Sequence, residues 1–368
     1  MLKKKQRNIL VFIPSIEGGG VEKNLFLIIN FLIKNNFNIV LITANPESKK
    51  KFHKKITIIS PQNQYSRNFS RYKKYFYCLF LLFKFLANNN FTVLSFQANL
   101  YAIIVAKLLC KKIIIRSNSS PSGWSQNPIK KIIYKILFKL ADAIIVNSID
   151  FANQMYEIFN VKCEVIYNPL NKEEIIKKGK ERFFNKFLYK NKNFFKIVSV
   201  GRFVDQKDHL TLLKAFQIIY KKINAKLILM GQGINKGEYL QFIKNNNLQN
   251  DVLILKFNNN PYKVISNANL FVLSSQYEGL PNVLLEAMTL KKFIISTNCP
   301  TGPREILMNG KLGFLCKIGD YRNLSNLILK YYYNQKKFNY KIQKAYKSLN
   351  RFDFDKNCKK YLKLLNKS

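Results

Sequence analysis

Two glutamates stand in the segment SSQYEGLPNVLLEAM, residues 274–288, with the spacing E-x7-E. Glu278 lies in a loop before a predicted helix, and Glu286 lies inside that helix on an apolar stretch. A buried carboxylate is costly without a partner. Because ionised carboxylates accept hydrogen bonds from hydroxyl groups, the pair favours a polyol ligand, and the helix start between them favours a phosphate. The alternative is a capping acid followed by a buried structural acid.

A second segment, GRFVDQKDH at residues 201–209, follows an apolar strand pattern and brings Arg202 and Lys207 to one strand end. Two cations at that place could neutralise a diphosphate, arginine through its bidentate fork and lysine as a point charge. The alternative is two solvated surface charges, which are common in so basic a chain.

A glycine loop, Gly18 to Gly20, separates the first predicted strand from the first predicted helix. Glycines let the backbone approach a phosphate or a sugar closely, and the helix start offers free N–H groups. The spacing is not G-x-G-x-x-G, so a dinucleotide fingerprint is absent, and a plain flexible turn is the alternative.

A further strand-to-helix loop, STNCPTGPREIL at residues 296–307, is stiffened by Pro300, Gly302 and Pro303. A rigid packing turn and a loop that closes over a ligand explain it equally well.

Metal and histidine chemistry are disfavoured by the composition. The chain has two histidines, and its six cysteines are far apart with no C-x-x-C pair, which is typical of reduced thiols in a cytoplasm. Asp353 and Asp355 form a D-x-D, but a Lys-rich helix follows it and helix capping is the better interpretation. We therefore expect no metal and no cofactor.

The formal net charge of +42 raises the question of a nucleic-acid partner. Only 9 of the 62 basic residues are arginine, and Asn, Ile, Phe and Tyr are abundant. That composition is what an AT-rich coding sequence produces, and readers of nucleic acid favour arginine. We expect no nucleic-acid partner, although a basic nucleic-acid-binding protein is kept as the alternative from another functional class.

Strand-like and helix-like segments alternate along both halves of the chain, which predicts an α/β fold with parallel sheets covered on both faces. In the first half, helices are predicted at 71–87, 98–109, 129–140 and 149–159 between short apolar strands. The pattern restarts at FKIVSVG with helices at 208–221, 236–246 and 261–267 and one from Pro281.

The length of 368 residues predicts two domains. We expect an N-terminal Rossmann-like domain over 1–170, a linker over 171–193, a second Rossmann-like domain over 194–349 and a tail helix over 350–368. The longest apolar stretch, residues 75–83, is too short for a membrane-spanning helix. Because parallel sheets bind ligands at the carboxyl ends of their strands, two facing sheets would hold the ligand in the cleft between them.

These segments together resemble family-4 retaining glycosyltransferases with the GT-B fold, and most closely a subgroup that builds cell-envelope or lipid-linked glycans. EGLPNVLLEAM is similar to the family's E-x7-E signature, and GRFVDQKD is similar to its arginine–lysine segment. LILMGQG, PYKVISNANLFVLSS and PTGPREIL follow in the family's order.

The resemblance implies a role for each matching position. Arg202 and Lys207 would bind the donor diphosphate, Glu278 would hold the transferred sugar, and Glu286 would bind the ribose. The remaining donor-binding positions that it implies are Gly19, Gly20, Gly279, Leu280, Asn282, Val283, Phe257 and Asn258. The tail helix would cross back onto the first domain.

The sequence departs from the family pattern at the first domain's strand end, where many members carry a histidine that faces the sugar. Here the strand end reads Arg116, Ser117, Asn118, which puts the contact to the sugar's 6-hydroxyl in doubt. These three residues are the candidates for the sugar or acceptor side. Asn298 stands where an aspartate is usual.

The activity implied is metal-independent transfer of a hexose or N-acetylhexosamine from a nucleotide-sugar, UDP-linked by expectation, to a glycan or lipid-linked acceptor. A GT-B-fold epimerase, which would need an acid–base set rich in histidine, and a phosphorylase, which would need a longer chain, are the alternatives within the fold.

Two basic and apolar segments favour a cytoplasmic protein at an anionic membrane surface. In PIKKIIYKILFKLA, residues 128–141, isoleucines and leucines form one helical face with the lysines off it, and RYKKYFYCLFLLFK, residues 71–84, is similar in composition. The alternative is that each helix buries its apolar face on a sheet and leaves its lysines in water.

Overall fold

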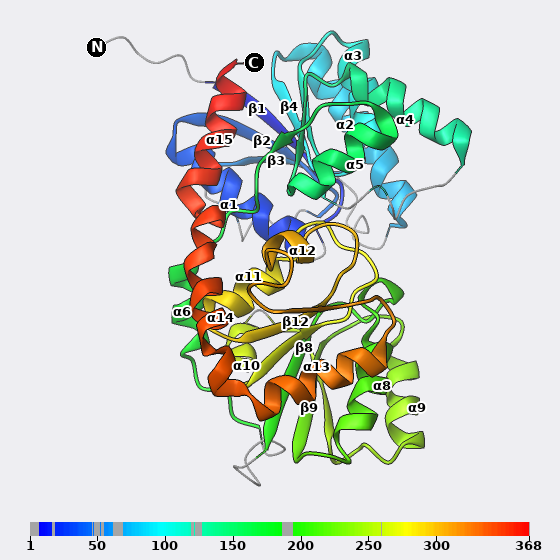
Figure 1. Ribbon diagram of the computed structural model, residues 1–368. Helices are drawn as coiled ribbons and strands as arrows, with labels where there is room; N and C mark the ends of the chain where they lie inside the picture. Colours follow the sequence, from blue (N-terminus) through cyan, green and yellow to red (C-terminus); the bar gives the residue numbers. More distant parts are fainter. Residues whose placement is uncertain are drawn as a thin grey trace. The chain divides into compact units, whose positions relative to one another are not determined.

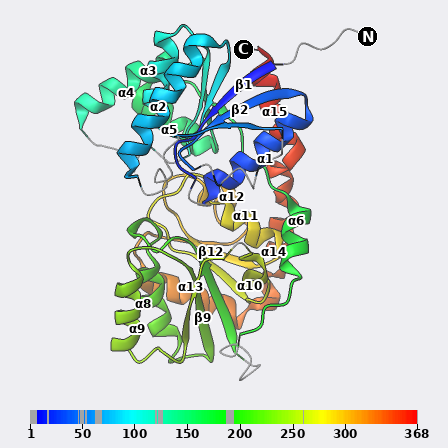
Figure 2. The same ribbon diagram turned by 180° about the vertical axis from the view of Figure 1, so that it is seen from behind.

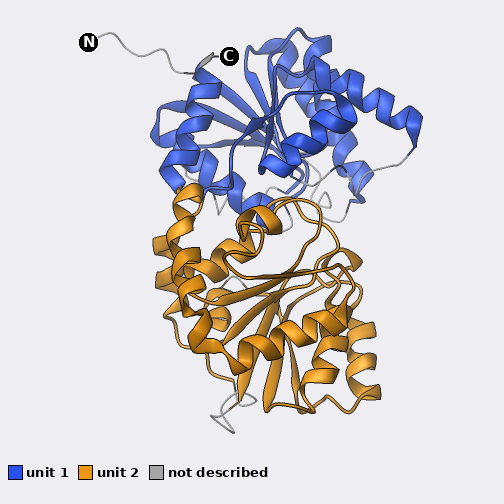
Figure 3. Ribbon diagram, in the orientation of Figure 1, with its two compact units in different colours: residues 1–169, 354–368 blue, residues 170–353 orange. Residues whose placement is uncertain are grey.

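The computed structural model describes residues 7–16, 19–45, 47, 52, 55–61, 69–118, 121, 127–185, 194–258 and 260–367. The chain divides into two compact units, the first built from residues 1–169 and 354–368 and the second from residues 170–353 (Figure 3). All seven strands of the first unit's sheet and five of the six strands of the second follow the strand patterns of the sequence, and each unit has its own core.

The first unit contains a seven-stranded sheet in the order β3-β2-β1-β4-β5-β6-β7, with every neighbouring pair parallel (Figure 1). Its strands are β1 (Arg7–Phe12), β2 (Phe37–Ile42), β3 (Thr57–Ile59), β4 (Thr92–Ser95), β5 (Ile113–Arg116), β6 (Ala143–Val146) and β7 (Glu164–Val165). Its helices are α1 (Gly20–Lys34), α2 (Arg71–Asn88), α3 (Asn99–Leu108), α4 (Pro128–Leu140), α5 (Ile149–Phe159) and α15 (Phe354–Lys367).

Side chains alternate between the two faces of this sheet, as strand geometry requires. In β1, Ile9 and Val11 join a core with α1 and α15, whereas Leu10 and Phe12 join a core with α2, α3, α4 and α5. Figures 1 and 2 show α1 and α15 side by side on one face and the other four helices on the opposite face. Burial on both faces explains why the strands are continuously apolar.

The second unit contains a six-stranded parallel sheet in the order β10-β9-β8-β11-β12-β13. Its strands are β8 (Phe195–Val200), β9 (Ala225–Gly231), β10 (Val252–Lys256), β11 (Leu270–Leu273), β12 (Phe293–Thr297) and β13 (Phe314–Cys316). Its helices are α6 (Lys172–Gly179), α8 (His209–Ile219), α9 (Lys236–Asn245), α10 (Tyr262–Ser266), α11 (Asn282–Thr289), α12 (Pro303–Ile306), α13 (Tyr321–Tyr333) and α14 (Gln335–Ser348), with 3-10 turns η4 (Asp205–Lys207) and η5 (Leu349–Phe352).

Two expectations about the connections need correction. Part of the predicted linker is helical, since α6 occupies residues 172–179 and belongs to the second unit, while residues 186–193 lie outside the described part of the chain. The tail is not one helix, because η5 ends the second unit and α15 begins at Phe354 in the first. None of the helices in the described part combines the length and apolar composition needed to cross a bilayer.

Candidate active site

The sheet order of the second unit marks one place for a ligand. Strand order reverses between β8 and β11, since β9 and β10 lie on one side and β12 and β13 on the other. In open parallel sheets, ligands bind beyond the carboxyl ends of the strands at such a switch point. The loop after β8 carries Arg202 and Lys207, and the loop after β11 carries Glu278.

Lys207 and Glu278 meet at this switch point. The ammonium of Lys207 donates a hydrogen bond to Oε1 of Glu278, and the two form an ion pair with side chains only 15% and 7% exposed. Arg202, Lys207 and Glu278 were each expected to contact the nucleotide-sugar. In the structure, Lys207 and Glu278 also contact each other. A charge pair this buried is retained only where the geometry satisfies both groups.

The carboxylate of Glu278 is fixed further by Ser275, whose hydroxyl donates to the same Oε1 at 2.7 Å. The hydroxyl of Thr301 donates to the backbone carbonyl of Glu278 at 2.6 Å, and that of Thr297 donates to the carbonyl of Ser275 at 2.6 Å. Among the described residues, Oε2 of Glu278 accepts no hydrogen bond. This oxygen is therefore the one that a ligand hydroxyl can use.

The loops after β8 and β11 are held to each other by three further hydrogen bonds. The amide of Gln206 donates to the carbonyl of Tyr277 at 2.9 Å, the Gln276 N–H donates to the carbonyl of Gln206 at 2.8 Å, and the hydroxyl of Ser274 donates to the carbonyl of Lys207 at 3.1 Å. These hydrogen bonds preorganise the ion pair. Gln206, Gln276 and Ser274 were not among the residues predicted from the sequence, although Gln206 stands directly beside Lys207 in the motif.

Arg202 lies outside the buried pair. Its side chain is exposed, and Nη2 donates to Oε1 of Gln206 at 3.3 Å. Since Gln206 also contacts the loop that carries Glu278, Arg202 lies beside the same switch point with a guanidinium open to solvent.

A close approach of backbone ties the loop at 296–307 to the one at 274–288. Gly302 has φ +77°, and a Cβ placed there would lie 2.3 Å from the carbonyl oxygen of Gly279 and 2.7 Å from Cδ of Pro281. Only glycine fits both the left-handed conformation and the contact. The stiff loop therefore supports the backbone next to Glu278.

The start of α11 carries the other donor-binding candidates of this segment. Leu280 and Glu286 are buried at 5% and 7% exposure, and Gly279 is buried as well. Asn282 and Val283 are half-buried in the first turn of α11. Phe257 and Asn258 are exposed just after β10, the outermost strand of the second sheet. Like Glu278, they follow the carboxyl end of a parallel strand.

In the first unit, the glycine candidates lie at the corresponding place, between β1 and α1. The N–H of Gly19 donates to Oε2 of Glu22 at 2.7 Å, so a carboxylate of the first turn occupies one of the amides expected to meet a phosphate. Gly20 is the first residue of α1, whereas Gly18 lies outside the described residues.

Arg116 has a different place from the one expected. Its side chain is fully buried in the first unit, where Nη2 donates to Oδ1 of Asn168 at 2.5 Å and Nε donates to Oδ1 of Asn118 at 3.0 Å. The rings of Phe96 and Tyr361 lie 6.0 and 5.8 Å from the guanidinium. Burial lowers the pKa of Arg116 to about 10. Arg116 thus ties the sheet to α15 and offers no surface to a sugar.

The neighbouring candidates differ from Arg116 in exposure. Ser117 is buried at 5%, and Asn118 is half-buried with its amide donating to the carbonyl of Phe96 at 3.1 Å. The sugar-side role remains a prediction for these two residues.

Two titratable groups beside the pair are held neutral. His209 is buried at 1% exposure against the rings of Phe203 and Tyr239, and burial lowers its pKa to about 3, helped by the charge of Lys207. Burial likewise raises the pKa of the Cys299 thiol to about 12, helped by Glu278. Neither group is an acid–base catalyst near neutral pH.

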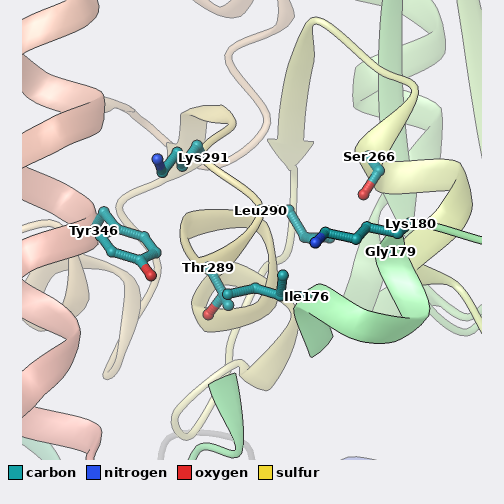
Figure 4. A pocket seen from close by; sticks show the side chains of 8 residues that line it. All are labelled: Ile176, Gly179, Lys180, Ser266, Thr289, Leu290, Lys291 and Tyr346. Carbon is teal, nitrogen blue, oxygen red and sulfur yellow. The ribbon is translucent and has the colours of Figure 1, made fainter. Parts of the chain in front are cut away.

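A pocket of about 410 Å³ in the second unit lies apart from this site. It is bounded by the ends of α6 and α11, and Figure 4 shows Thr289 and Leu290 on its wall with Lys180 and Lys291 beside it. Because α11 begins next to Glu278 and ends at Thr289, the pocket lies at the other end of that helix. In the described part of the chain, no three His, Cys, Asp or Glu side chains are grouped as metal ligands.

Two family models match most of the chain between them. Residues 179–348 match the model "Glycosyl transferases group 1", and residues 18–174 match "Glycosyltransferase Family 4". The first match contains Lys207, Glu278 and Glu286, and the second contains Gly19 and Gly20.

Individual proteins agree with the family models. An uncharacterised glycosyltransferase of Methanocaldococcus jannaschii is 34% identical over 56% of this chain and 55% of its own. An N-acetylgalactosaminyltransferase of Campylobacter jejuni that acts on an N,N'-diacetylbacillosaminyl-diphospho-undecaprenol glycan is 30% identical over 61% of this chain and 62% of its own. The chain thus spans somewhat over half the length of these two relatives.

The fold agrees with solved structures over nearly the full length. The Anabaena protein HepE, solved in complex with UDP, matches with a TM-score of 0.77 at 17% identity and covers 98% of this chain and 100% of its own. The chain has two Rossmann-like units, both glycosyltransferase family models match it, and its fold agrees with that of HepE. The chain therefore belongs to the family-4, group-1 glycosyltransferases of the GT-B fold.

Proposed function

We propose that this protein is a metal-independent retaining glycosyltransferase that transfers a hexose or an N-acetylhexosamine from a UDP-sugar to a lipid-linked or cell-envelope glycan. The observation that carries the proposal is the buried Lys207–Glu278 pair at the switch point of the second sheet. A carboxylate with one free oxygen beside a cation matches the junction between a sugar and a diphosphate.

In the proposed reaction, Oε2 of Glu278 accepts a hydrogen bond from a hydroxyl of the sugar. The bond between the anomeric carbon and the diphosphate oxygen breaks through an oxocarbenium-like state. Lys207, Arg202 and the N–H groups at the start of α11 stabilise the negative charge on the leaving diphosphate. The acceptor oxygen bonds to the anomeric carbon on the face that the diphosphate leaves, and the departing oxygen takes its proton.

The choice of donor and acceptor rests on the relatives. HepE was solved with UDP, and the Campylobacter relative acts on a glycan attached to diphospho-undecaprenol. A lipid-linked acceptor is held at a membrane, so we place the protein on the inner face of the cell membrane as a peripheral protein. Neither a cofactor nor nucleic acid has a part in the proposed reaction.

The test begins with thermal unfolding of the wild-type protein against UDP-, GDP- and ADP-sugars, because a ligand that binds only the folded state raises the melting temperature. UDP-hexoses or UDP-N-acetylhexosamines should give the largest shift. Release of UDP in the presence of a polyprenyl-diphosphate glycan then measures transfer, and NMR of the product gives the anomeric configuration. The proposal fails if no nucleotide-sugar shifts the melting temperature, or if the product is inverted.

A further inference from the structure

The apolar stripe of α4 faces solvent. Its members are spaced by three and four residues and are 46–67% exposed, and they are Ile129, Ile132, Ile133, Ile136 and Leu140. Phe138, on the opposite side of the helix, is the one buried side chain of α4. A helix on a sheet normally turns its apolar stripe inward, so the orientation of α4 is inverted, and the alternative in which α4 buries this stripe on the sheet is wrong.

Cations flank the stripe. Lys130 lies on one side of it and Lys135 and Lys139 lie on the other, at 100° per residue, and all three are exposed. Between Glu47 and Asp142 the sequence contains no acidic residue. Lysines beside an apolar stripe can lay their alkyl chains along it while the ammonium groups reach outward.

The neighbouring helices continue this surface. In α2 the buried side chains recur every fourth residue from Lys74 to Leu86. The side turned away from them carries large residues that are 43–82% exposed, and these are Tyr72, Phe76, Tyr77, Phe80 and Phe83. In α3, Tyr101, Ile104 and Leu108 are 40–72% exposed.

The three helices form one continuous face. α3 contacts both α2 and α4, and Figures 1 and 2 show the three side by side on the same face of the first sheet. We call their outer surface the α2–α4 face. At the start of α2 it contains a hollow of about 600 Å³ lined by Phe69, Tyr72, Lys73, Phe76 and Tyr77.

We propose that the α2–α4 face docks on an anionic lipid bilayer. Thirteen large apolar side chains of α2, α3 and α4 are exposed to water on this face. A contiguous apolar patch of this kind is rare on a protein without a partner. Its charge is of one sign, which complements an anionic surface, and its apolar stripe with lateral lysines is the arrangement of helices that lie in the headgroup layer. The aromatic hollow of α2 offers room to acyl chains.

This inference rests on the proposed function in one respect: a lipid-linked acceptor would lie in the bilayer, which explains why the enzyme would bind there. The glycosyltransferase site lies on other residues, so the two ideas fail separately. Substitutions on the α2–α4 face should leave the melting-temperature shift with UDP-sugars unchanged, because they touch neither Glu278 nor Lys207.

The experiment is co-sedimentation of the full chain with vesicles of phosphatidylcholine that contain about one third phosphatidylglycerol, at low salt. Binding is expected with these vesicles, absent with pure phosphatidylcholine, and weaker in about 0.5 M NaCl, where the Debye length is only a few ångströms. The double variant Ile132→Ser, Ile136→Ser should weaken binding about tenfold or more by removing two inserted side chains.

A charge variant tests the electrostatic part. Lys73, Lys84, Lys130 and Lys135 are exposed, so all four are changed to Glu, whereas Lys74 is buried at 7% and stays. The matched controls lie in the second unit. For the charge variant, the exposed residues Lys221, Lys222, Lys336 and Lys337 are changed to Glu, and for the apolar variant, Ile234 and Tyr333, 87% and 67% exposed, are changed to Ser. The four-lysine variant should stay in the supernatant, and both control variants should bind like the wild type.

Three outcomes would overturn the proposal. The first is wild-type protein that stays in the supernatant with anionic vesicles at low salt. The second is equal loss of binding in the controls, which would assign it to net charge. The third is a concentration-dependent dimer in sedimentation velocity that Ile132→Ser, Ile136→Ser abolishes while vesicle binding is unchanged, which would assign the face to a second copy. Unchanged melting temperatures establish that each variant folds.

Discussion

Lys207 and Glu278, 71 residues apart in the sequence, form an ion pair inside the second unit. Each belongs to a different strand-end loop, and the loops are joined by hydrogen bonds of Gln206, Gln276 and Ser274. The site is thus assembled before a donor arrives, with the charge of Lys207 already balanced. Its arrangement leads to five predictions.

Substituting the two cations should separate their roles. Lys207→Ala and Arg202→Ala should each lower kcat/KM by about 2–4 kcal/mol of transition-state stabilisation, as for loss of one oxyanion donor. Lys207→Ala should also lower the free energy of unfolding by about 3 kcal/mol, because it leaves the carboxylate of Glu278 buried without its cation. Arg202 is exposed, so its variant should keep the wild-type urea midpoint. Near wild-type turnover in either variant would remove that residue from the site.

The two glutamates should respond differently to UDP. Glu278→Gln should lower turnover more than UDP affinity, because its free oxygen is assigned to the sugar. Glu286→Gln should weaken binding of UDP itself, because Glu286 is assigned to the ribose. Titration calorimetry with UDP alone measures the second effect, and equal affinities in wild type and Glu286→Gln would contradict that assignment.

Gly302→Ala should disturb the site from a distance. The added Cβ would meet the carbonyl of Gly279, next to Glu278. Gly319→Ala is the matched control, since Gly319 has φ +73° and nothing lies within 4 Å of its Cβ position. Both changes place an alanine at positive φ, which costs about 1 kcal/mol or more of backbone strain. We expect turnover to fall at least about tenfold in Gly302→Ala and to stay near the wild-type value in Gly319→Ala. Equal losses of turnover in both variants would show that backbone strain, and not the contact with Gly279, causes the loss.

His209 should make the protein sensitive to acid. Its pKa of about 3 lies below the value of about 6.5 in the unfolded chain. Below pH 6.5 the unfolded chain therefore binds a proton that the folded one does not, and stability falls as the pH falls toward 3. From pH 7.5 to 5.0, urea unfolding of the wild type should lose about 2 kcal/mol more than that of His209→Leu. Parallel losses in the two proteins would contradict the neutral, buried imidazole.

Turnover should continue in EDTA. The leaving diphosphate has Lys207 and Arg202 as cationic partners, and the D-x-D residues Asp353 and Asp355 lie at the start of α15 and not in a loop that follows a strand of the second sheet. Equal initial rates with EDTA and with added Mn²⁺ are the expected result. Activity that disappears in EDTA and returns with Mn²⁺ would replace this mechanism by a metal-assisted one.

Much of the architecture was predictable because burial on both faces leaves a local signal. Apolar strand runs such as those of β1 and β8 and the helix periodicities between them predicted the parallel sheets. The switch-point loops could also be named from the sequence, since residues that follow parallel strands share one edge. The short strand β13 was missed, because three residues carry too little periodicity.

Other features depend on tertiary contacts that periodicity does not report. The spacing of Ile129, Ile132 and Ile136 shows that they share a helix face but not whether that face meets the sheet, and in α4 it is Phe138 that does. The burial of Arg116 depends on Asn168 and on Tyr361, which are far away in the sequence. The pairing of Lys207 with Glu278 likewise depends on the hydrogen bonds that hold the loop after β8 against the loop after β11.

The first unit is built from two separate segments of the chain, and the second of these supplies α15. Its core includes Tyr361 and Leu365 from α15, whereas all residues of the second unit lie within 170–353. A chain that ends near residue 353 therefore has the whole sequence of the second unit, whereas the α1 side of its first sheet lacks its cover. A purified chain truncated after residue 353 should therefore be protease-resistant in residues 170–353 and protease-sensitive in residues 1–169, so the loss of α15 would destabilise the N-terminal unit.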